Sequence, residues 1–405
     1  MSISIHHLPT DLKNLSSNEL DALCRDLRRV IIDTVSTNGG HLASNLGVVE
    51  LSVALHRVFS SPQDLLVWVV GHQCYAHKLL TGRAEKFSTL RKIDGISGFP
   101  KREESVHDAF NTGHSSTSIS AALGIAEASR LNGHTRHVIA IVGDGALTGG
   151  MIWEAMNHAV DLGRPLIVVL NDNEMSISYN LGSITRYLNK FRTAPAYRKT
   201  KRSVIELLKK TPVIGEWLAK WISKFKSGLK QLLLPGIIFE DLGFTYLGPL
   251  DAHNVSDLCA VLQQAKQLDT PVVVHCISKK GKGYVPAEIN PSAYHGVGNF
   301  DVDSGNIDNS RQCLSFTDVF GATLVTLADS DSKIVAISAA MVDGTGLKQM
   351  AQKHSSRLYD VGIAEQHAVT FAAGLASQGL MPVVALYSTF VQRAYDQLLH
   401  DVCLQ

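Results

Sequence analysis

Two polar clusters follow apolar runs in the sequence and could bind a metal ion together. Gly143-Asp144-Gly145 follows the run 137–142, and Asn171-Asp172-Asn173-Glu174-Met175 follows the run 166–170. A diphosphate carries several charges, so a chain without a large basic patch binds it best through a hard divalent cation and backbone N–H groups at a helix N-terminus. Asp144 can supply a carboxylate, and Asn173 and the carbonyl of Met175 can supply neutral oxygens. These three residues are the predicted ligands of one Mg²⁺.

Each cluster also has an ordinary interpretation, because Gly-Asp-Gly and Asn-Asp-Asn are common turn sequences after strands. The segment between the clusters carries Glu154, Asn157 and His158 on one predicted helix. With that helix between them, the two clusters resemble the paired signature of enzymes that bind thiamine diphosphate. The predicted cofactors are therefore thiamine diphosphate and Mg²⁺.

The elements that must position these clusters alternate between strand and helix. Apolar runs at 137–142, 166–170 and 272–277 are typical of strands, and a helical pattern at 151–160 separates the first two. Strands that are apolar throughout are buried on both faces, as in a parallel sheet between two layers of helices. The predicted fold class is α/β, with parallel sheets covered by helices on both faces. An amphipathic helix is also predicted from the capping box at Ser16 to about residue 35.

The predicted organisation is one full domain followed by a partial second one. Residues 1–300 form the domain that holds both clusters, with a Lys- and Arg-rich helical insertion at about 185–235 whose charges form a solvated face rather than a basic binding arm. Residues 301–314 are the predicted linker, within a Gly-, Asn-, Asp- and Ser-rich stretch that begins near residue 286. Residues 315–405 resume the strand and helix patterns but fall short of the ~100–150 residues of a typical domain. Unpaired strand edges are expected to leave this second domain marginal unless another chain completes it.

Composition limits the classes of partner. The chain has 405 residues, of which 45% are hydrophobic and 19% charged, and its net charge is +1. This makeup is typical of a globular protein and gives no field that favours nucleic acid or an anionic membrane. No apolar run reaches the ~18 residues of a membrane span, and the N-terminus lacks the pattern of a secretory signal. The six cysteines have no metal-binding spacing, so we expect them to be reduced and the chain to be cytoplasmic.

Several longer motifs carry a more specific resemblance. They are Gly71-His72-Gln73, His77-Lys78-Leu79-Leu80-Thr81-Gly82-Arg83, Gly98-Phe99-Pro100-Lys101-Arg102, the stretches 113–118, 279–284, 294–296 and 360–370, Tyr387-Ser388-Thr389-Phe390 and Arg393-Ala394-Tyr395-Asp396-Gln397. In this order they resemble the 1-deoxy-D-xylulose-5-phosphate synthases, a thiamine-diphosphate-dependent family of the transketolase superfamily. General transketolases lack most of these motifs. The resemblance covers essentially the whole chain.

The resemblance implies a thiamine-diphosphate-binding fold and an activity. The family condenses pyruvate with D-glyceraldehyde 3-phosphate to give 1-deoxy-D-xylulose 5-phosphate and CO₂, the first step of non-mevalonate isoprenoid synthesis. A homodimer is expected by analogy. The rest of the family's pyrimidine-binding domain, and its third domain of the transketolase C-terminal type, are not in the sequence, so a complementing C-terminal chain is a further expected partner.

Two other functions stay open. The chain can be a fragment or degenerate relative that binds the cofactor without turnover, or a transketolase-like enzyme that transfers a two-carbon or acyl unit to another acceptor. The stretch 387–397 argues against the second of these.

Roles for residues in the second domain follow from the resemblance. Glu365 matches the acid that hydrogen-bonds the cofactor's pyrimidine ring, and burial would favour its protonated form. Its ordinary interpretation is a helix N-terminal Glu stabilised by the dipole. Phe390 matches the aromatic residue that stacks on the pyrimidine, or else is a core aromatic. Tyr387 and Arg393 match positions that bind the phosphate of the acceptor, or else form a surface polar pair.

The first domain supplies the remaining predicted contacts. His41, His72 and His114 are predicted to transfer protons, and His295 to contact substrate, although any one of them alone is more often structural. The predicted cofactor-binding set is His72, Gly113, His114, Ser115, Ser116, Gly143, Asp144, Gly145, Ala146, Asn173, Lys280, Tyr284, Glu365 and Phe390.

The sequence departs from the family pattern at three positions. Val69 stands where the family has Asp, Ala252 where it has Gly, and Ala339 where it has Pro. The first departure replaces a carboxylate by an apolar side chain, which puts local polar pairing in doubt.

Overall fold

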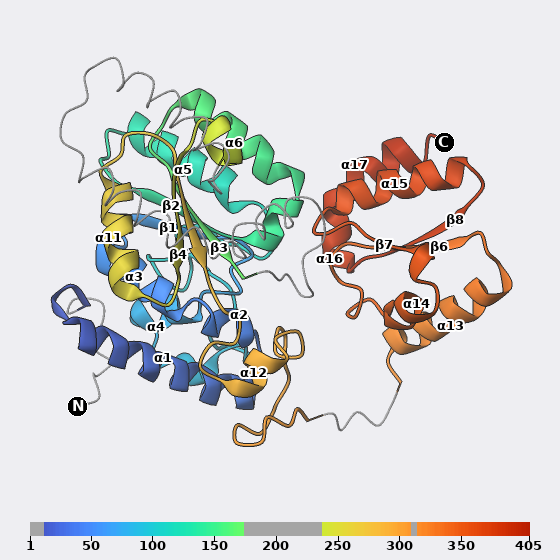
Figure 1. Cartoon of the computed structure of the whole chain (residues 1–405), viewed down its shortest axis with the longest axis horizontal. Coiled ribbons are helices and arrows are strands. Elements are labelled where there is room, and N and C mark those ends of the chain that lie inside the picture. Colours follow the sequence, from blue (N-terminus) through green and yellow to red (C-terminus); the bar gives the residue numbers. More distant parts are fainter. Residues whose placement is uncertain (1–11, 174–236, 309–313) are drawn as a thin grey trace, which may run out of the picture.

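The computed structural model describes residues 12–173, 237–308 and 314–405. They form two parallel sheets with their helices (Figure 1): one sheet lies in residues 12–308 and the other in residues 314–405. The predicted insertion at about 185–235 lies outside the described residues, and so does Met175.

The first sheet has five described strands in the order β1-β2-β3-β5-β4, all parallel. Their bounds are β1 Leu65–Trp68, β2 Val138–Gly143, β3 Ile167–Asp172, β4 Thr245–Asp251 and β5 Val272–Ile277. Alternate residues of β2 enter two different apolar clusters: Ile139 and Ile141 pack on one face, and Ala140 and Val142 on the other. This confirms the prediction of a parallel sheet buried on both faces.

Helices cover both faces of this sheet (Figure 1). One layer contains α1 (Ser17–Asn38), α2 (Ala43–Leu46), α3 (Val49–Val58), α4 (Tyr75–Leu80) and α11 (Val255–Lys266), and the other contains α5 (Ser118–Leu131), α6 (Gly150–Leu162) and α10 (Ile237–Asp241). The predicted capping box is present, because the Ser16 backbone N–H donates to the Glu19 carboxylate at 2.7 Å. Among the described residues no helix is both long and apolar enough to span a membrane.

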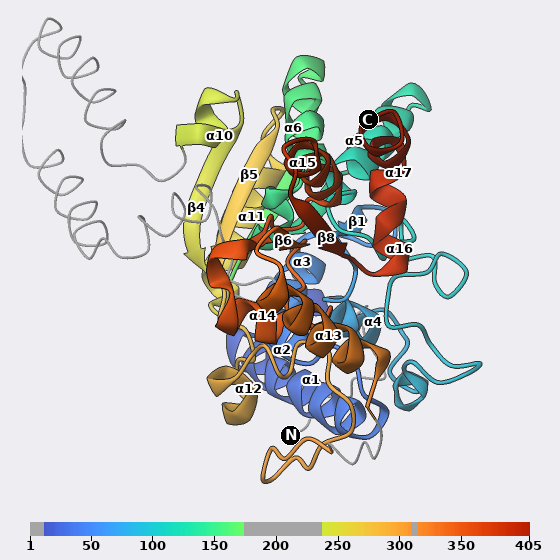
Figure 2. The same ribbon diagram turned by 90° about the vertical axis from the view of Figure 1, so that its right-hand side faces the viewer.

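The second sheet has three described parallel strands in the order β7-β6-β8. Their bounds are β6 Ile334–Ser338, β7 Leu358–Asp360 and β8 Met381–Ala385. Helices α13 (Phe316–Ser330) and α14 (Lys348–Lys353) pack on one face and α15 (Glu365–Ser377) on the other. After β8 the chain continues through α16 (Ser388–Val391) and α17 (Tyr395–Gln397) (Figure 2), and α17 contacts α15.

The segment after α12 (Val285–Ile289) packs against the first domain, within the polar stretch whose last part, 301–314, is the predicted linker. Tyr294, Val297 and Phe300 are buried in the core around α1, and Val297 forms an antiparallel bridge with Gly40. A second bridge joins Phe300 to Ile307. The polar turn residues of this stretch therefore alternate with three apolar side chains that pack into the core.

Two helical glycines of the second domain differ in what surrounds them. A Cβ built on Gly321 in α13 would lie 2.2 Å from the Gly346 carbonyl oxygen, whereas no described atom lies within 4 Å of one built on Gly374 in α15. We expect Gly321→Ala to destabilise the second domain by about 1–3 kcal/mol through overpacking. Gly374→Ala should instead stabilise it by about 0.5–1 kcal/mol, since alanine is the better helix former. Urea unfolding of both variants checks this, and equal effects would contradict the close packing of α13.

Candidate active site

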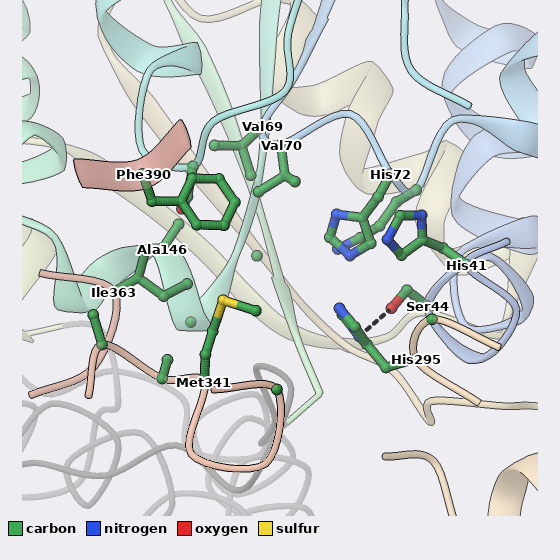
Figure 3. Close-up of a pocket in the computed structure, with 18 of the residues that line it drawn as sticks. His41, Ser44, Val69, Val70, His72, Ala146, His295, Met341, Ile363 and Phe390 are labelled. Atoms are coloured by element: carbon green, nitrogen blue, oxygen red, sulfur yellow. Dashed lines mark hydrogen bonds between the residues drawn. The ribbon is translucent and has the colours of Figure 1, made fainter. Parts of the chain in front are cut away.

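One cavity of about 570 Å³ collects residues that follow strands of both sheets. In the first domain these residues follow β1, β2, β3 and β5, and in the second they follow β6, β7 and β8. The carboxyl ends of parallel strands are where α/β proteins place their ligands, because side chains there leave the packed layers. Figure 3 shows His41, His72 and His295 on one side of this cavity and Met341, Ile363 and Phe390 on the other.

Most of the predicted site residues line this cavity. They are His41, His72, Gly113, Ser115, Gly143, Asp144, Gly145, Ala146, Asn173, Lys280, His295, Glu365, Tyr387, Phe390 and Arg393. The fold thus brings together residues that the sequence separates by hundreds of positions.

The predicted metal ligands come from neighbouring strands. Strands β2 and β3 pair in parallel with Gly143 opposite Asn171, so Asp144 and Asn173 each lie just beyond that register. Asp144 is 5% exposed and begins a short 3-10 helix, Asp144–Thr148. The described residues contain no cluster of three or more His, Cys, Asp or Glu side chains arranged to hold a metal. The expected ligand set is of another kind, with one carboxylate, one amide and a carbonyl from Met175, which is not described.

Three histidines form a compact group in the cavity wall. The ring centroids of His41, His72 and His295 are 5.1 to 5.5 Å apart. Burial lowers the pKa of His41 to about 4, and it holds the pKa values of the other two rings well below their ordinary value. The Nδ1 atoms of His41 and His72 are buried and have no hydrogen-bond partner within the described ranges. At neutral pH these rings are therefore uncharged and can exchange hydrogen bonds with a ligand.

Lys280 adds a buried cation to the same wall. It is 5% exposed, and burial lowers its pKa to about 8 even though the nearby Asp144 carboxylate opposes that shift. The ammonium group that faces this cavity thus carries a desolvation penalty that an anionic ligand would offset.

Glu365 is the first residue of α15 and lines the cavity from the second domain. It is 4% exposed, and its Oε2 atom accepts no hydrogen bond from the described residues, although Arg393 Nη1 lies 3.5 Å away. Arg393 also donates through Nη2 to the carbonyl of Ser115. Glu365 thus lies at a helix N-terminus and also in the cavity wall, so its position is compatible with both interpretations from the sequence.

Aromatic rings form the opposite wall. Phe390 stacks on Tyr387 with ring centroids 6.0 Å apart and an interplanar angle of 8°. His114 meets Phe390 edge-on at 5.2 Å, and its Nε2 lies 3.2 Å from the Thr389 hydroxyl. Of the residues described, His114 is not one that lines the cavity, and its contacts place it beside Phe390 instead.

Two other predicted cofactor contacts also lie off the described cavity wall. Ser116 is 1% exposed and donates to the carbonyl of Ala146, so it supports the turn after β2. Tyr284 packs edge-on against Tyr294 and donates to the Val302 carbonyl. Between Lys280 and Tyr284, two glycines with positive φ, 281 and 283, turn the chain, which directs Lys280 to the cavity and Tyr284 to the core.

Several residues line the cavity that were not predicted from the sequence. They are Ser44, Val69, Val70, Gln73, Phe99, Ser292, Gly296, Ala339, Ala340, Met341, Asp343, Gly344 and Ile363. Their position directly after β1, β6 and β7 is the signal that could have identified many of them. Val70 and Ala340 have positive φ angles of 57° and 61°, which non-glycine residues seldom adopt and which cluster at functional sites.

The three departures from the family pattern are accommodated by packing. Val69 is 4% exposed within the apolar cluster that contains α5, and Ala252 is fully buried in the opposite cluster. Ala339 is 5% exposed at the cavity wall. Each apolar side chain therefore replaces the family residue without adding a buried polar group.

The two domains meet beside the cavity. The backbone N–H of Ile363 donates to the Thr148 hydroxyl at 2.8 Å, and a Cβ on Gly362 would lie 2.8 Å from Thr148 Cβ. Likewise a Cβ on Gly149 would lie 3.0 Å from the Ile363 carbonyl oxygen. Close backbone approach at these glycines lets both sets of strand ends face one cavity.

Comparison with known proteins identifies the family. The sequence model described as 1-deoxy-D-xylulose-5-phosphate synthase matches residues 3–278, and the transketolase pyrimidine binding domain matches residues 312–405. The chain belongs to the 1-deoxy-D-xylulose-5-phosphate synthase family. This confirms the resemblance seen in the motifs.

Individual relatives agree with this assignment. The chain is 58% identical over 401 residues to a 1-deoxy-D-xylulose-5-phosphate synthase from Desulforudis audaxviator, which covers 99% of this chain and 63% of the relative. It is 57% identical over 397 residues to one from Heliobacterium modesticaldum, which covers 98% of this chain and 61% of the relative. The chain thus spans less than two thirds of the length of these synthases.

A solved structure supports the fold alone. The transketolase of Campylobacter jejuni superposes with a TM-score of 0.52 at 16% identity, over 95% of this chain and 67% of that one. The α/β thiamine-diphosphate-binding fold expected from the motifs is confirmed by this likeness and by the family match.

The low pKa of His41 predicts how stability depends on pH. Above its ordinary value of 6.5 the ring is neutral whether the chain is folded or unfolded. Below 6.5 the unfolded chain takes up the proton first, so stability falls as the pH drops from 6.5 towards about 4. We expect His41→Gln to reduce the loss of stability between pH 7 and pH 5 by on the order of 1–2 kcal/mol. Urea unfolding at both pH values checks this, with the exposed His134→Gln as the control, and an unchanged pH dependence would contradict it.

Proposed function

We propose that this chain binds thiamine diphosphate with Mg²⁺ and uses it to condense pyruvate with D-glyceraldehyde 3-phosphate, giving 1-deoxy-D-xylulose 5-phosphate and CO₂. The observation that carries the proposal is the single cavity, which holds Asp144 and Asn173 at one set of strand ends and Glu365 and Phe390 at the other. Family membership supports the same activity, because the relatives at 57–58% identity are named as that synthase.

The residues of the first domain fit a metal-bound diphosphate. Asp144 and Asn173 offer a carboxylate and an amide oxygen, which suit Mg²⁺. Gly113 lines the cavity, and an added Cβ there would meet no described atom within 4 Å, so the backbone borders open space. Lys280 supplies a positive charge at low exposure.

The residues of the second domain fit the ring end of the cofactor. Glu365 presents a buried carboxyl oxygen that has no hydrogen-bond partner in the described part of the chain, which suits a hydrogen bond to a nitrogen of a ligand ring. Phe390 offers an aromatic face in the same wall. A ligand with an aromatic ring at one end and a diphosphate at the other matches the two sets of strand ends that border the cavity.

When bound, thiamine diphosphate supplies the carbon nucleophile and the electron sink that the decarboxylation of pyruvate requires. In our proposal Glu365 holds a proton at the pyrimidine ring, and His41, His72 and His295 hold and move protons beside the substrate carbonyls. Their uncharged state at neutral pH allows each ring to accept or donate a hydrogen bond. His114 acts indirectly, by packing against Phe390.

Substrate binding is proposed for Tyr387 and Arg393. Two of the guanidinium nitrogens of Arg393 face Glu365 and the Ser115 carbonyl, which fixes the side chain in the cavity wall. Guanidinium carries five N–H donors, so a phosphate oxygen can still be bound by those that remain. Apolar residues, including Val70, Phe99 and Met341, line the same space and would reduce the number of water molecules beside a bound substrate.

Cofactor binding and turnover are separable. A chain that binds without turnover would use the same Asp144 and Asn173, and only an assay of CO₂ release and ketose phosphate formation distinguishes it. A two-carbon transfer to another acceptor would be recognised by product identification. The homodimer and the complementing C-terminal chain expected from the resemblance stay predictions.

Asp144→Ala tests the metal site. We expect the affinity of the chain for thiamine diphosphate in the presence of Mg²⁺ to fall by about 10- to 100-fold, because the carboxylate is the charged ligand of the predicted site. Chelation of Mg²⁺ should have a similar effect on the parent. Titration calorimetry measures both, with Asp161→Ala on the exposed surface as a charge-matched control. Equal affinities of parent and Asp144→Ala would refute the site.

Glu365→Gln tests the role of the buried acid. The amide keeps the shape of the side chain but loses its ionisable proton, so we expect CO₂ release from pyruvate to fall by about 10²- to 10⁴-fold while cofactor affinity changes little. Glu154→Gln, on the exposed side of α6, is the matched control. If the parent binds cofactor yet releases no CO₂, binding without turnover is the better description of the chain. If Glu365→Gln is as active as the parent, the role proposed for Glu365 is wrong.

A further inference from the structure

Three polar side chains at the cavity form a hydrogen-bonded row that the proposed chemistry does not use, and one of them, Gln73, itself lines the cavity. Asn171 Nδ2 donates to Gln73 Oε1 at 3.0 Å, and Ser278 Oγ donates to Asn171 Oδ1 at 2.7 Å. Asn171 is 1% exposed and Gln73 is 7% exposed. Both ends of the Asn171 amide are thus engaged, which fixes its orientation.

The row runs across four strand ends. Gln73 belongs to the loop after β1, Asn171 is near the end of β3, and Ser278 directly follows β5. In the sheet order β1-β2-β3-β5, the bond from Gln73 to Asn171 has to pass the end of β2. Gly143 is the residue there, paired with Asn171, and a Cβ on it would lie 3.5 Å from Gln73 Nε2. A larger side chain at 143 would occupy the path of the row.

Each member of the row adjoins a residue that lines the cavity. Gln73 follows His72, Asn171 is two residues before Asn173, and Ser278 is two residues before Lys280. Asp144 directly follows Gly143, over which the row passes. The side chains of the row therefore tie together the loops that carry these four cavity residues.

Asp172, the next residue of β3, has a separate set of side-chain contacts. Asp172 Oδ2 lies 3.0 Å from His275 Nε2, and His275 Nδ1 lies 2.7 Å from the Tyr246 hydroxyl. Successive strand residues point to opposite faces, so β3 is linked to its neighbours on both faces at its carboxyl end. Of these two described links, the row through Asn171 reaches β1 and passes β2, whereas the link through Asp172 runs to β5 and β4.

We propose that Gln73, Asn171 and Ser278 are positioning residues that set the spacing of His72, Asp144, Asn173 and Lys280, and thereby the affinity for Mg²⁺ and thiamine diphosphate. The inference rests on the proposed function, because it assumes that these four residues bind that cofactor. Ser278 is the member best suited to a test, since it is small, is partly exposed and is not one of the described residues that line the cavity.

The test compares Ser278→Ala with Ser278→Thr in the full chain. Loss of the hydroxyl removes one hydrogen bond to Asn171, so Ser278→Ala should weaken thiamine diphosphate binding in the presence of Mg²⁺ by about three- to tenfold. Ser278→Thr keeps the hydroxyl and should bind within about twofold of the parent. Titration calorimetry gives the affinities, and thermal unfolding without cofactor shows whether each variant is folded.

Ser36→Ala is the matched control. Ser36 Oγ donates to the Asp33 carbonyl at 2.8 Å within α1, so this variant also loses one hydrogen bond of a serine hydroxyl. It should lower the unfolding temperature without changing cofactor affinity. A weaker affinity in Ser278→Ala that is restored in Ser278→Thr and absent in Ser36→Ala supports a positioning role.

A double-mutant cycle tests whether the row acts as one unit. Gln73 lines the cavity, so Gln73→Met can also change affinity directly, but a direct effect would add to that of Ser278→Ala. Because Asn171 bridges Gln73 and Ser278, the two variants should have non-additive effects on affinity if the row transmits position. Unchanged affinity in Ser278→Ala, or additive effects in the cycle, would overturn the inference while leaving cofactor binding by the parent intact. Failure of the parent to bind would overturn the proposed function, and this inference with it.

Discussion

The burial of parallel strands on both faces is the constraint on which the rest of the structure depends. Because helices cover each face of the first sheet, residues such as Ile141 and Val142 can only be apolar, and polar side chains can leave the layers only where a strand ends. In the second sheet β6 shows the same burial, because its five residues are all buried before Ala339 reaches the wall. The chemistry is confined to the strand ends by the packing of the strands.

Confinement has an energetic cost that explains the character of the site. Lys280, Glu365 and the histidines are ionisable groups placed where water is largely excluded, and the lowered pKa values of Lys280 and His41 express that cost. Two histidine nitrogens and one carboxyl oxygen are buried without a hydrogen bond from any residue that the structure describes. Such groups destabilise a chain by themselves. A ligand that supplies hydrogen-bond partners at one end and negative charge at the other would offset much of the penalty.

The sequence was sufficient for the elements with strong patterns and insufficient where tertiary context decides. Strands β2, β3 and β5 are long apolar runs, and they were predicted together with Asp144 and Asn173 at their ends. Strand β4 was missed because Gly248 and Pro249 interrupt it, which an edge strand with an irregular register tolerates. Gln73 lies inside the Gly71-His72-Gln73 motif, yet the role we propose for it depends on the order of β1, β2 and β3 in the sheet, which no local pattern reveals. Tyr284 is predicted, like Lys280, to contact the cofactor, but the glycine turn between them directs Lys280 to the cavity and Tyr284 to the core.

The contact between the domains completes the cavity and links its two ends. Arg393 in the second domain reaches the Ser115 carbonyl in the first and lies 3.5 Å from Glu365, so the position of the buried acid is connected to a backbone group of the proposed diphosphate site. Thr148 makes the second connection, because its hydroxyl accepts a hydrogen bond from the backbone N–H of Ile363, two residues before Glu365. Thr148 is also the last residue of the short helix that begins at Asp144. A ligand that bridges Asp144 and Glu365 therefore spans the same two elements that these contacts already join. Binding and domain docking should consequently stabilise each other, since a shift at either end would strain both.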